Sequence, residues 1–406
     1  MHRSIKSVRD FLASKLIPGR TLLLALSGGG DSLALFYILI ECLDFFDFEL
    51  HVAHVDHAWR AESGVEAQAL ERLVRGFVIP FHHRRLSPIS GPNLEERYRD
   101  ERYAFFGKLQ KEWGFQAILL AHHADDQGET VLKRICEGAR IGALGGLRSE
   151  TKLENLTLWR PLLSSRKEEL ITLLKSKQID PIDDWTNRDV HYLRPRMRLE
   201  MFPQLEKQFG KNIGRNFHRF ALLFQDVRDY LEKKRQQIEK KMMRGLFGAY
   251  LERPSQLAQL EMRYFLEETA RRYGVHLSHS SCHTLVRLIE EHACSATIYA
   301  GELTYVLNKE ILFVIDTAFP PFNWGDWKES REPSTWREFW RGMCSPMPSG
   351  AQLLLIGALT PILRKKLRRW YAEHHVPPFF HDKAPIFCAR GKIVGECLTG
   401  KSLNAL

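Results

Sequence analysis

The chain has 406 residues, of which 44% are hydrophobic and 27% are charged. These fractions are ordinary for a folded globular protein, and they exclude a disordered or fibrous chain. Lysine and arginine outnumber aspartate and glutamate by 59 to 49, which gives a formal net charge of +10. A basic chain of this length is expected to form two or three domains and favours a polyanionic partner such as nucleic acid.

The cysteines and the apolar segments bear on the cellular compartment. Seven cysteines are scattered from Cys42 to Cys397 without a C-x-x-C pair, which predicts reduced thiols and argues against a zinc ribbon or a thioredoxin motif. The first six residues are not followed by an apolar signal core, and the longest apolar run, Leu33–Leu43, is too short to cross a bilayer. We therefore expect a cytoplasmic protein with no membrane partner.

The first half of the chain alternates predicted strands with predicted helices. The strands are expected at Thr21–Leu26, Phe48–Val55, Phe77–His82 and Gln116–Ala121. The helices are expected at Ser32–Leu43, Glu62–Arg75, Asn93–Trp113 and Asp125–Glu137. Asn93 and Glu96 form a candidate capping box for the third helix. This alternation predicts an α/β fold with a doubly wound parallel sheet, whose ligands bind at the carboxyl ends of the strands.

The pattern changes after residues 142–146. A helix is expected at Arg166–Lys177, and a long basic helix at about Phe217–Arg244 opens a helical region that continues to about Glu291. Short strands follow, then a Pro- and Trp-rich linker, and then a segment that mixes strands with a basic helix around Leu363–Tyr371. We therefore predict three domains, an α/β domain, a helical linker and middle domain, and a small α+β carboxyl-terminal domain, at 1–215, 216–325 and 335–406.

A glycine-rich motif between the first strand and the first helix carries the strongest functional signal. It consists of Ser27, Gly28, Gly29, Gly30, Asp31 and Ser32. Backbone N–H groups at such a turn, together with the helix dipole, form an anion site, and the glycines let the backbone approach a phosphate closely. The two serines can add hydroxyl donors, and Asp31 is placed to hold a phosphate-bound Mg²⁺.

Several glycine motifs are excluded at this loop. No lysine follows the glycines as in a Walker loop, Leu33 stands where a dinucleotide fingerprint needs glycine, and Ala25 stands where a nucleophile elbow needs glycine. The pattern S-G-G-x-D-S is instead that of the pyrophosphate loop in enzymes that cleave ATP between the α and β phosphates. A flexible strand–helix turn is the alternative without function.

Two further motifs follow the second and fourth predicted strands. His54-x-Asp56-His57 ends the second strand, where it would contact adenosine in a nucleotide site or, alternatively, ligate Zn²⁺ or Mn²⁺. The segment His122–Thr130 leaves the fourth strand and enters a helix. Within this segment, Asp126 and Glu129 are three residues apart and share a helix face. Two carboxylates on one face can bind either Mg²⁺ or a cationic substrate. The alternative without a binding function is that acidic residues at a helix N-terminus complement the helix dipole.

A pair of arginines lies on the helix expected to begin at Asn93. Arg99 and Arg102 share one face of this helix, and paired guanidinium groups are typical of phosphate contacts. Neighbouring glutamates could equally pair with them as a surface network, so both interpretations remain open.

These motifs, in this order, resemble those of tRNA(Ile)-lysidine synthetases. The resemblance rests on Ser27–Ser32, His54–His57, residues 93–103, His122–Glu129 and residues 184–187, and it covers about residues 20–198. It implies an enzyme that uses ATP to adenylate the C2 oxygen of the wobble cytidine in the CAU anticodon of tRNA(Ile). The ε-amine of free L-lysine then displaces AMP and forms lysidine, which changes codon reading from AUG to AUA and charging identity from Met to Ile.

The resemblance also implies roles for the motif residues. The loop 27–32, with Asp31 and Mg²⁺, would hold the departing pyrophosphate, and Asp126 and Glu129 would bind and deprotonate lysine. Further contacts to ATP are assigned to His54, Asp56, Arg99, Arg102 and His122. The oligomeric state does not follow from the sequence, which is compatible with a homodimer.

The chain departs from the family pattern at several positions. Glu137 stands where the family commonly has Arg, Pro195 where it tends to have Asn, and His381 and Gly395 where Arg and Trp are expected. The tRNA contacts of the carboxyl-terminal segment are therefore expected only in outline. Three alternatives remain: a tRNA thiolase with the same loop, a metal-dependent phosphoesterase, and a basic RNA-binding protein with an inactive nucleotide loop.

Overall fold

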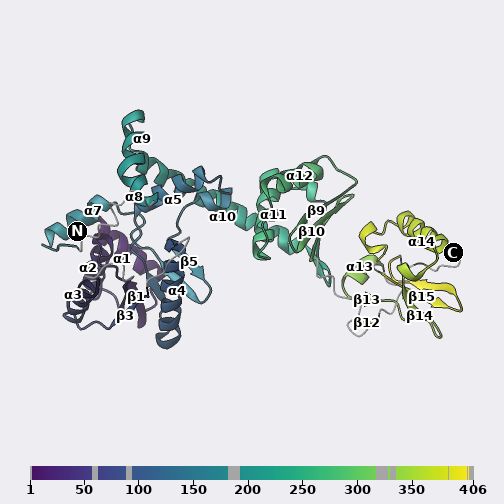
Figure 1. The fold of residues 1–406 in the computed structure, drawn as a ribbon, viewed down its shortest axis with the longest axis horizontal. Coiled ribbons are helices and arrows are strands. Elements are labelled where there is room, and N and C mark those ends of the chain that lie inside the picture. Colours follow the sequence, from purple (N-terminus) through teal and green to yellow (C-terminus); the bar gives the residue numbers. More distant parts are fainter. Residues whose placement is uncertain are drawn as a thin grey trace. The chain divides into compact units, whose positions relative to one another are not determined.

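The computed structural model describes residues 2–56, 63–87, 94–181, 193–316, 328–329, 335–382, 384–399 and 401. It forms two compact units, Met1–Arg228 and Asp229–Leu406 (Figure 1). The predicted division into three domains stays a prediction. Some of the sequence motifs lie outside the described residues, namely His57, Asn93, residues 184–187 and most of the Pro-rich linker.

The first unit is built on a six-stranded sheet with the order β3-β2-β1-β4-β6-β5. Its strands are β1 (Arg20–Ala25), β2 (Phe48–Asp56), β3 (Phe81–Arg85), β4 (Ala117–Leu119), β5 (Glu150–Leu153) and β6 (Leu156–Trp159). Neighbouring strands pair in parallel, except that β5 pairs antiparallel with β6 at the edge. The predicted α/β class with a parallel sheet is therefore confirmed.

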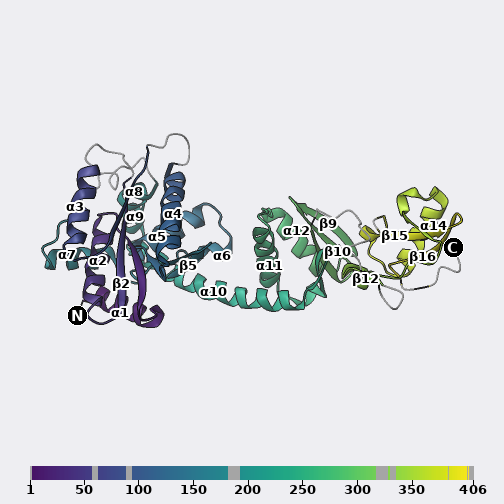
Figure 2. The same cartoon turned by 90° about the horizontal axis from the view of Figure 1, so that it is seen from below.

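Helices cover both faces of this sheet (Figure 2). They are α1 (Arg3–Lys15), α2 (Gly30–Cys42), α3 (Ser63–Arg75), α4 (Leu94–Trp113), α5 (Ala124–Cys136), α6 (Ile141–Leu144) and α7 (Lys167–Ser176). Leu22 and Leu24 of β1 pack into a core with α1, α2, α3 and α7, whereas Leu23 packs into a core with α4 on the other face. A strand buried on both faces reads as a continuous apolar run, which is why β1 was predictable.

The structure corrects some element boundaries and adds elements. The third strand begins at Phe81 rather than Phe77, because α3 ends in a turn in which Val78 takes a φ of +59° and is exposed. The hairpin of β5 and β6, which turns at Glu154 with a φ of +50°, was not predicted. Helix α1 was not predicted either, although Val8 and Leu12 on one of its faces are fully buried.

A series of helices leads out of the first unit. They are α8 (Leu193–Arg196), a π-helical turn (Met197–Met201), α9 (Phe202–Phe209) and α10 (Ile213–Lys241). The start of α10 packs closely on α5, since a Cβ added at Gly128 would lie 3.2 Å from the Gly214 carbonyl oxygen. Gln225 donates hydrogen bonds to the carbonyls of Gly145 and Leu147 at 2.8 and 3.0 Å. The first half of α10 is therefore part of the α/β unit.

The second unit contains a five-stranded antiparallel sheet with the order β7-β8-β11-β10-β9. The strands are β7 (Met243–Gly245), β8 (Gly248–Glu252), β9 (Ser295–Ala300), β10 (Leu303–Asn308) and β11 (Ile311–Asp316). Helices α11 (Gln259–Arg272) and α12 (His279–Glu290) share a core with this sheet. The sequence predicted a helical region to about Glu291 followed by short strands, so β7 and β8, which precede α11, were not expected.

The carboxyl-terminal segment forms a smaller α+β region of the second unit. Its larger elements are α13 (Trp336–Trp340), β14 (Gln352–Leu355), α14 (Pro361–Glu373), β15 (Pro385–Ala389) and β16 (Lys392–Glu396). Trp336, Trp340 and Phe380 pack with Phe313 of β11 and with Phe247, which lies between β7 and β8, in one aromatic core.

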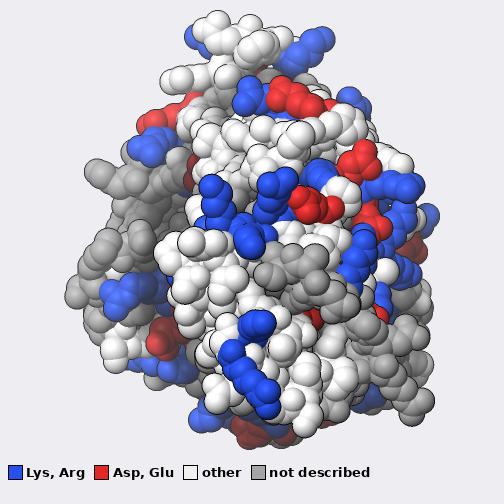
Figure 3. Space-filling model, turned by 90° about the vertical axis from the view of Figure 1, so that its right-hand side faces the viewer, with Lys and Arg blue, Asp and Glu red and all other residues white. Residues whose placement is uncertain are grey.

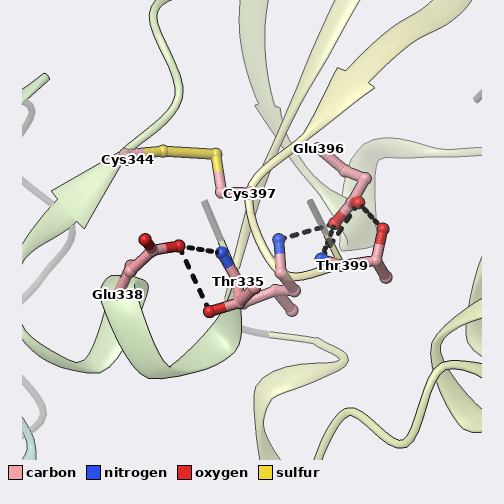
Figure 4. The surroundings of a disulfide bond; sticks show 7 residues. Thr335, Glu338, Cys344, Glu396, Cys397 and Thr399 are labelled. Carbon is pink, nitrogen blue, oxygen red and sulfur yellow. Dashed lines mark hydrogen bonds between the residues drawn. A yellow bond between two sulfur atoms is a disulfide. The ribbon is translucent and has the colours of Figure 1, made fainter. Parts of the chain in front are cut away.

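One cysteine pair contradicts the expectation of reduced thiols. Cys344 and Cys397 form a disulfide with their Cα atoms 5.7 Å apart (Figure 4). Both residues are buried, and each comes from a different end of the carboxyl-terminal region. Next to them, Glu396 accepts hydrogen bonds from the amides of Leu398 and Thr399. The cysteines are 53 residues apart in the chain, so only the fold brings them together.

Candidate active site

The glycine-rich loop joins β1 to α2, as predicted. Gly28 has a φ of +88°, which only glycine adopts without strain. The Ser32 hydroxyl donates to the Gly29 carbonyl at 2.9 Å and accepts from the Ser27 amide at 3.2 Å, so it fixes the turn from inside. Gly29 is the N-cap of α2 and has no side chain to bond the first-turn N–H groups. In the described structure no N-cap side chain occupies the N–H groups of the first turn, so they can bind an anion.

His54 and Asp56 lie at the end of β2, beside the loop. The His54 Nδ1 atom lies 2.8 Å from the carbonyl oxygen of Leu26, the residue before the loop. Burial lowers the pKa of His54, so its ring is neutral at pH 7 and Nδ1 donates to the carbonyl. Asp56 is also buried, with its carboxylate 3.5 Å from Nε of Arg85. Their predicted contact with adenosine stays a prediction.

His123 is the residue that connects the loop with α5. Its Nε2 atom lies 3.4 Å from Asp31 and 3.5 Å from Asp126, while its Nδ1 atom lies 3.5 Å from Asp125. Burial alone would lower the pKa of His123, but its hydrogen bonds to Asp125 and Asp31 and the charge of Asp126 outweigh burial and raise the pKa to about 10. The site therefore contains a buried histidine with a raised pKa among three carboxylates, and its Nδ1 atom also lies 3.2 Å from the Asp125 amide nitrogen.

This arrangement predicts how stability depends on pH. Because the pKa of His123 in the folded chain is about 10 and its ordinary value is 6.5, protonation stabilises the fold fully below pH 6.5. That contribution is lost as the pH rises through 10. We expect the urea midpoint of the native chain to fall between pH 7 and pH 10 by more than that of a His123→Gln variant. Equal falls in the two proteins would contradict the assigned charge.

Asp126 and Glu129 lie on one face of α5, as their spacing predicted, and both bind Arg198. Nη2 of Arg198 lies 2.7 Å from Asp126 Oδ1 and 3.1 Å from Glu129 Oε2, and its Nε also donates to Glu129. Burial raises the pKa of Glu129 despite this arginine. The pKa of Asp126 is lowered because the charges of His123 and Arg198 outweigh its burial. Arg198 was not among the predicted site residues.

Arginines surround His122 on the other side of the site. Burial lowers the pKa of His122 to about 3, and the positive charges of Arg160, Arg194 and Arg102 add to this effect. Burial lowers the pKa of Arg160 and the charge of Arg99 adds to this effect, so both predicted arginines, Arg99 and Arg102, belong to this positive region. Arg160 is buried and was not predicted, although it follows the end of β6 directly.

The residues present fit a nucleotide with its metal. His122 Nδ1 is buried and has no hydrogen-bond partner in the described structure, whereas His123 Nε2 lies between the carboxylates of Asp31 and Asp126. The loop offers N–H donors, and the side chain of Asp31 is 32% exposed beside it. Among the described residues, no three His, Cys, Asp or Glu side chains form a metal site of their own. The carboxylate of Asp31 beside the loop is the kind of ligand that holds Mg²⁺ together with substrate phosphates.

A parallel α/β sheet with this loop at the carboxyl end of β1 defines a PP-loop protein, and the PP-loop domain family matches residues 1–205. The tRNA(Ile)-lysidine synthase of Protochlamydia amoebophila is 31% identical over 98% of this chain and 93% of its own length. That of Chlamydia trachomatis serovar L2 is 39% identical over 56% of this chain and 70% of its own length. The chain belongs to the tRNA(Ile)-lysidine synthase family.

The solved U34-tRNA thiolase NcsA from Methanococcus maripaludis is 18% identical and matches with a TM-score of 0.44, over 54% of this chain and 77% of that chain. Among the helices that the structure describes, none is long and apolar enough to cross a membrane.

Proposed function

We propose that the chain joins free L-lysine to C2 of the wobble cytidine in the CAU anticodon of tRNA(Ile), with cleavage of ATP to AMP and pyrophosphate. The observation that carries the proposal is the convergence of three groups at one edge of the sheet. These groups are the glycine-rich loop, the His123 cluster and the acidic face of α5. The family relationship supports a ligase that forms a C–N bond on tRNA.

The first step activates the cytosine ring. C2 of cytosine is a poor electrophile, and adenylation of its oxygen creates a leaving group. The free N–H groups at the start of α2 would hold the β and γ phosphates as they depart. His123, whose pKa is raised and whose ring lies next to Asp31, would in its protonated form stabilise negative charge that develops at the phosphates. Mg²⁺ bound at Asp31 would neutralise part of the same charge.

The second step needs a neutral lysine amine, and carboxylates can bind the ammonium form and accept its proton. Asp126 and Glu129 are our candidates because they share a face and are nearly buried. In the structure their partner is the cation of Arg198. A lysine ammonium bound at these carboxylates would therefore replace part of the Arg198 interaction. Transfer to the ring at C2 would release AMP.

Basic residues of the second unit are the candidates for contact with tRNA. Several basic side chains on the two basic helices predicted from the sequence are already paired with acidic residues, so they are weaker candidates. The side chain of Arg235 is 3% exposed and binds Glu232, and Lys234 pairs with Glu261 at 3.2 Å. On α14, Arg368 and Arg369 pair with acidic neighbours, whereas Lys365 and Lys366 are exposed and form no ion pair with another described residue. Figure 3 shows groups of Lys and Arg side chains on one face of the molecule.

Binding of tRNA should therefore depend on these two lysines and on salt. We expect a Lys365→Gln/Lys366→Gln double variant to bind tRNA more weakly and to reduce the log–log salt slope by roughly one unit per lost contact. Filter binding over a salt series measures both quantities. Arg271→Gln is the control, since that guanidinium already pairs with Glu268 at 2.6 Å. An unchanged slope in the double variant would contradict a role for α14.

The proposed reaction is tested directly by incubating the chain with ATP, labelled L-lysine and a tRNA that carries the CAU anticodon. We expect stable label in the tRNA, with AMP and pyrophosphate formed in equal amounts. A tRNA whose wobble cytidine is replaced by uridine is the matched control and should remain unlabelled. Absence of label from the CAU substrate, with intact binding of ATP and tRNA, would contradict the proposal.

A further inference from the structure

The function proposed above assigns nothing to the disulfide between Cys344 and Cys397. Cys344 ends β13 (Met343–Cys344), and Cys397 directly follows β16. Both side chains are almost fully buried, in the core that also contains residues of α13 and α14. A Cα separation of 5.7 Å is within the ordinary range for a disulfide, so the bond forms without movement of the backbone. The other five cysteines are free, so among the described residues the fold brings only this pair within bonding distance.

The disulfide closes a loop that contains most of the carboxyl-terminal region. The two cysteines are 53 residues apart, and β14, α14, β15 and β16 lie between them. Closing a loop of this length removes many conformations of the unfolded segment, so the bond favours the folded form. Backbone pairing between the two ends is limited, among the described residues, to an isolated bridge between Thr335 and Thr399 (Figure 4). The covalent bond is therefore the strongest link between the two ends of this loop.

Helix α14 lies inside this loop, and its packing leaves polar groups unpaired. Leu367 and Tyr371 are fully buried in the core that contains both cysteines. The Tyr371 hydroxyl and the Trp370 Nε1 atom are buried without a hydrogen-bond partner in the described structure. Because an unpaired buried polar group costs free energy, the packing of α14 is less favourable than that of a fully hydrogen-bonded helix. Its position therefore depends on the closed loop more than a well-paired helix would.

We propose that Cys344 and Cys397 are a reversible redox pair, whose oxidation holds α14 in its packed position and thereby strengthens the binding of tRNA. The link to tRNA rests on the proposed function, in which Lys365 and Lys366 of α14 contact this substrate. Cells keep tRNA in reducing compartments, where protein disulfides are mostly transient or redox-sensing. A bond that forms and breaks with the redox state is therefore the form of cross-link that such a substrate favours.

The oxidant is a small-molecule disulfide such as oxidised glutathione. One cysteine thiolate attacks this disulfide and releases one small thiol, and the second cysteine then displaces the other small thiol from the mixed disulfide. Two cysteine S–H bonds are lost and one S–S bond forms in the protein. The S–S bond of the oxidant breaks, and its two sulfur atoms take up both electrons and both protons. Reduced glutathione drives the same exchange in reverse.

Mass spectrometry of the full chain, equilibrated with reduced or oxidised glutathione and then alkylated, tests whether the bond is reversible. We expect a cross-linked Cys344–Cys397 peptide after oxidation and its loss on return to reduced glutathione. Cys136 and Cys294 are exposed and unbonded, so they are the references and should form only glutathione adducts. The proposal is overturned if Cys344 and Cys397 never cross-link, or if the cross-link persists in reduced glutathione.

Hydrogen exchange in the two redox states tests what the bond does to α14. We expect amides of α14 to exchange roughly 10-fold or more slowly in the oxidised chain, because the closed loop has fewer open conformations. Amides of α4 in the first unit are the reference and should exchange at the same rate in both states. Equal rates for α14 in the cross-linked and reduced chains would overturn the proposal.

Two cysteine variants assign the effect to this pair. Cys397→Ala removes one partner, so exchange at α14 should no longer respond to the glutathione ratio. Cys388→Ala is the matched control, because Cys388 is a buried free cysteine of the same core, and it should keep the difference between the two states. A response that persists in Cys397→Ala, or that is lost in Cys388→Ala, would overturn the assignment. The comparison of the native chain in its two redox states does not depend on how well either variant folds.

Filter binding in both redox states tests the link to tRNA. We expect reduction to raise the Kd for tRNA roughly 3- to 10-fold, since a smaller fraction of the chain then holds α14 in position. The Lys365→Gln/Lys366→Gln double variant should lose this difference. Equal Kd values for the native chain, with slower exchange of α14 on oxidation, would overturn the link to tRNA and leave the redox pair standing. If the native chain forms no lysidine, the proposed function fails whatever the exchange rates show.

Discussion

Replacement of Asp31 by asparagine should reduce tRNA-dependent pyrophosphate release roughly 100- to 1000-fold. Asparagine keeps the shape of the side chain but removes the charge that lies 3.4 Å from His123 Nε2 and that is available to Mg²⁺ beside the loop. Ser32→Ala should have a similar effect, because its hydroxyl bonds both Ser27 and Gly29 and so fixes the phosphate-binding turn. Release of labelled pyrophosphate from γ-labelled ATP measures both variants.

Two exposed residues provide controls for these variants. Asp44→Asn removes a carboxylate in the turn after α2, and Ser14→Ala removes a hydroxyl that bonds only its own helix, at the Phe11 carbonyl. Both should release pyrophosphate at the native rate. The product is equally informative: the loop predicts AMP and pyrophosphate, so ADP as the main product of the native chain would contradict the assignment of the loop.

The part of the site that could be predicted from sequence is the part formed by neighbouring residues. The loop between β1 and α2 follows from an apolar run, consecutive glycines and an apolar helix, all within about two dozen residues. Asp126 and Glu129 were found by their spacing, because residues three apart on a helix share a face. The order of strands and helices placed both motifs at one edge of a parallel sheet.

The remaining residues depend on contacts between distant parts of the chain. Arg198 reaches Glu129 across 69 residues of sequence, and nothing in its local pattern distinguishes it from the surface arginines nearby. His122 and His123 are adjacent and look equivalent, yet one ring lies among arginines and the other among carboxylates. Arg235 is a residue for which the local pattern is misleading. It lies on a helix whose basic side chains were expected to face solvent, but the fold buries its side chain against Glu232 and Glu239.

Replacement of Glu129 should separate the two chemical steps. Glu129→Gln removes one of the two carboxylates on the acidic face of α5, and loss of a partner for a buried cation costs roughly 30-fold to several thousand-fold in binding. We therefore expect the lysine concentration needed for lysidine formation to rise by this factor. Pyrophosphate release should remain largely intact. In the described structure, the hydrogen bonds of the Glu129 carboxylate go to Arg198 and not to the glycine-rich loop.

The same helix supplies the control for this experiment. Glu137→Gln changes an exposed carboxylate at the end of α5, whose ion pair with Lys133 spans 3.8 Å, and should leave both steps unchanged. Asp126→Asn is less selective, because Asp126 lies 3.5 Å from His123 and so touches the cluster that contains Asp31. Pyrophosphate release and lysine incorporation are measured on one preparation of each variant. Equal losses of both in Glu129→Gln would place Glu129 in adenylation or in folding, because a residue that binds only the second substrate cannot slow the first step.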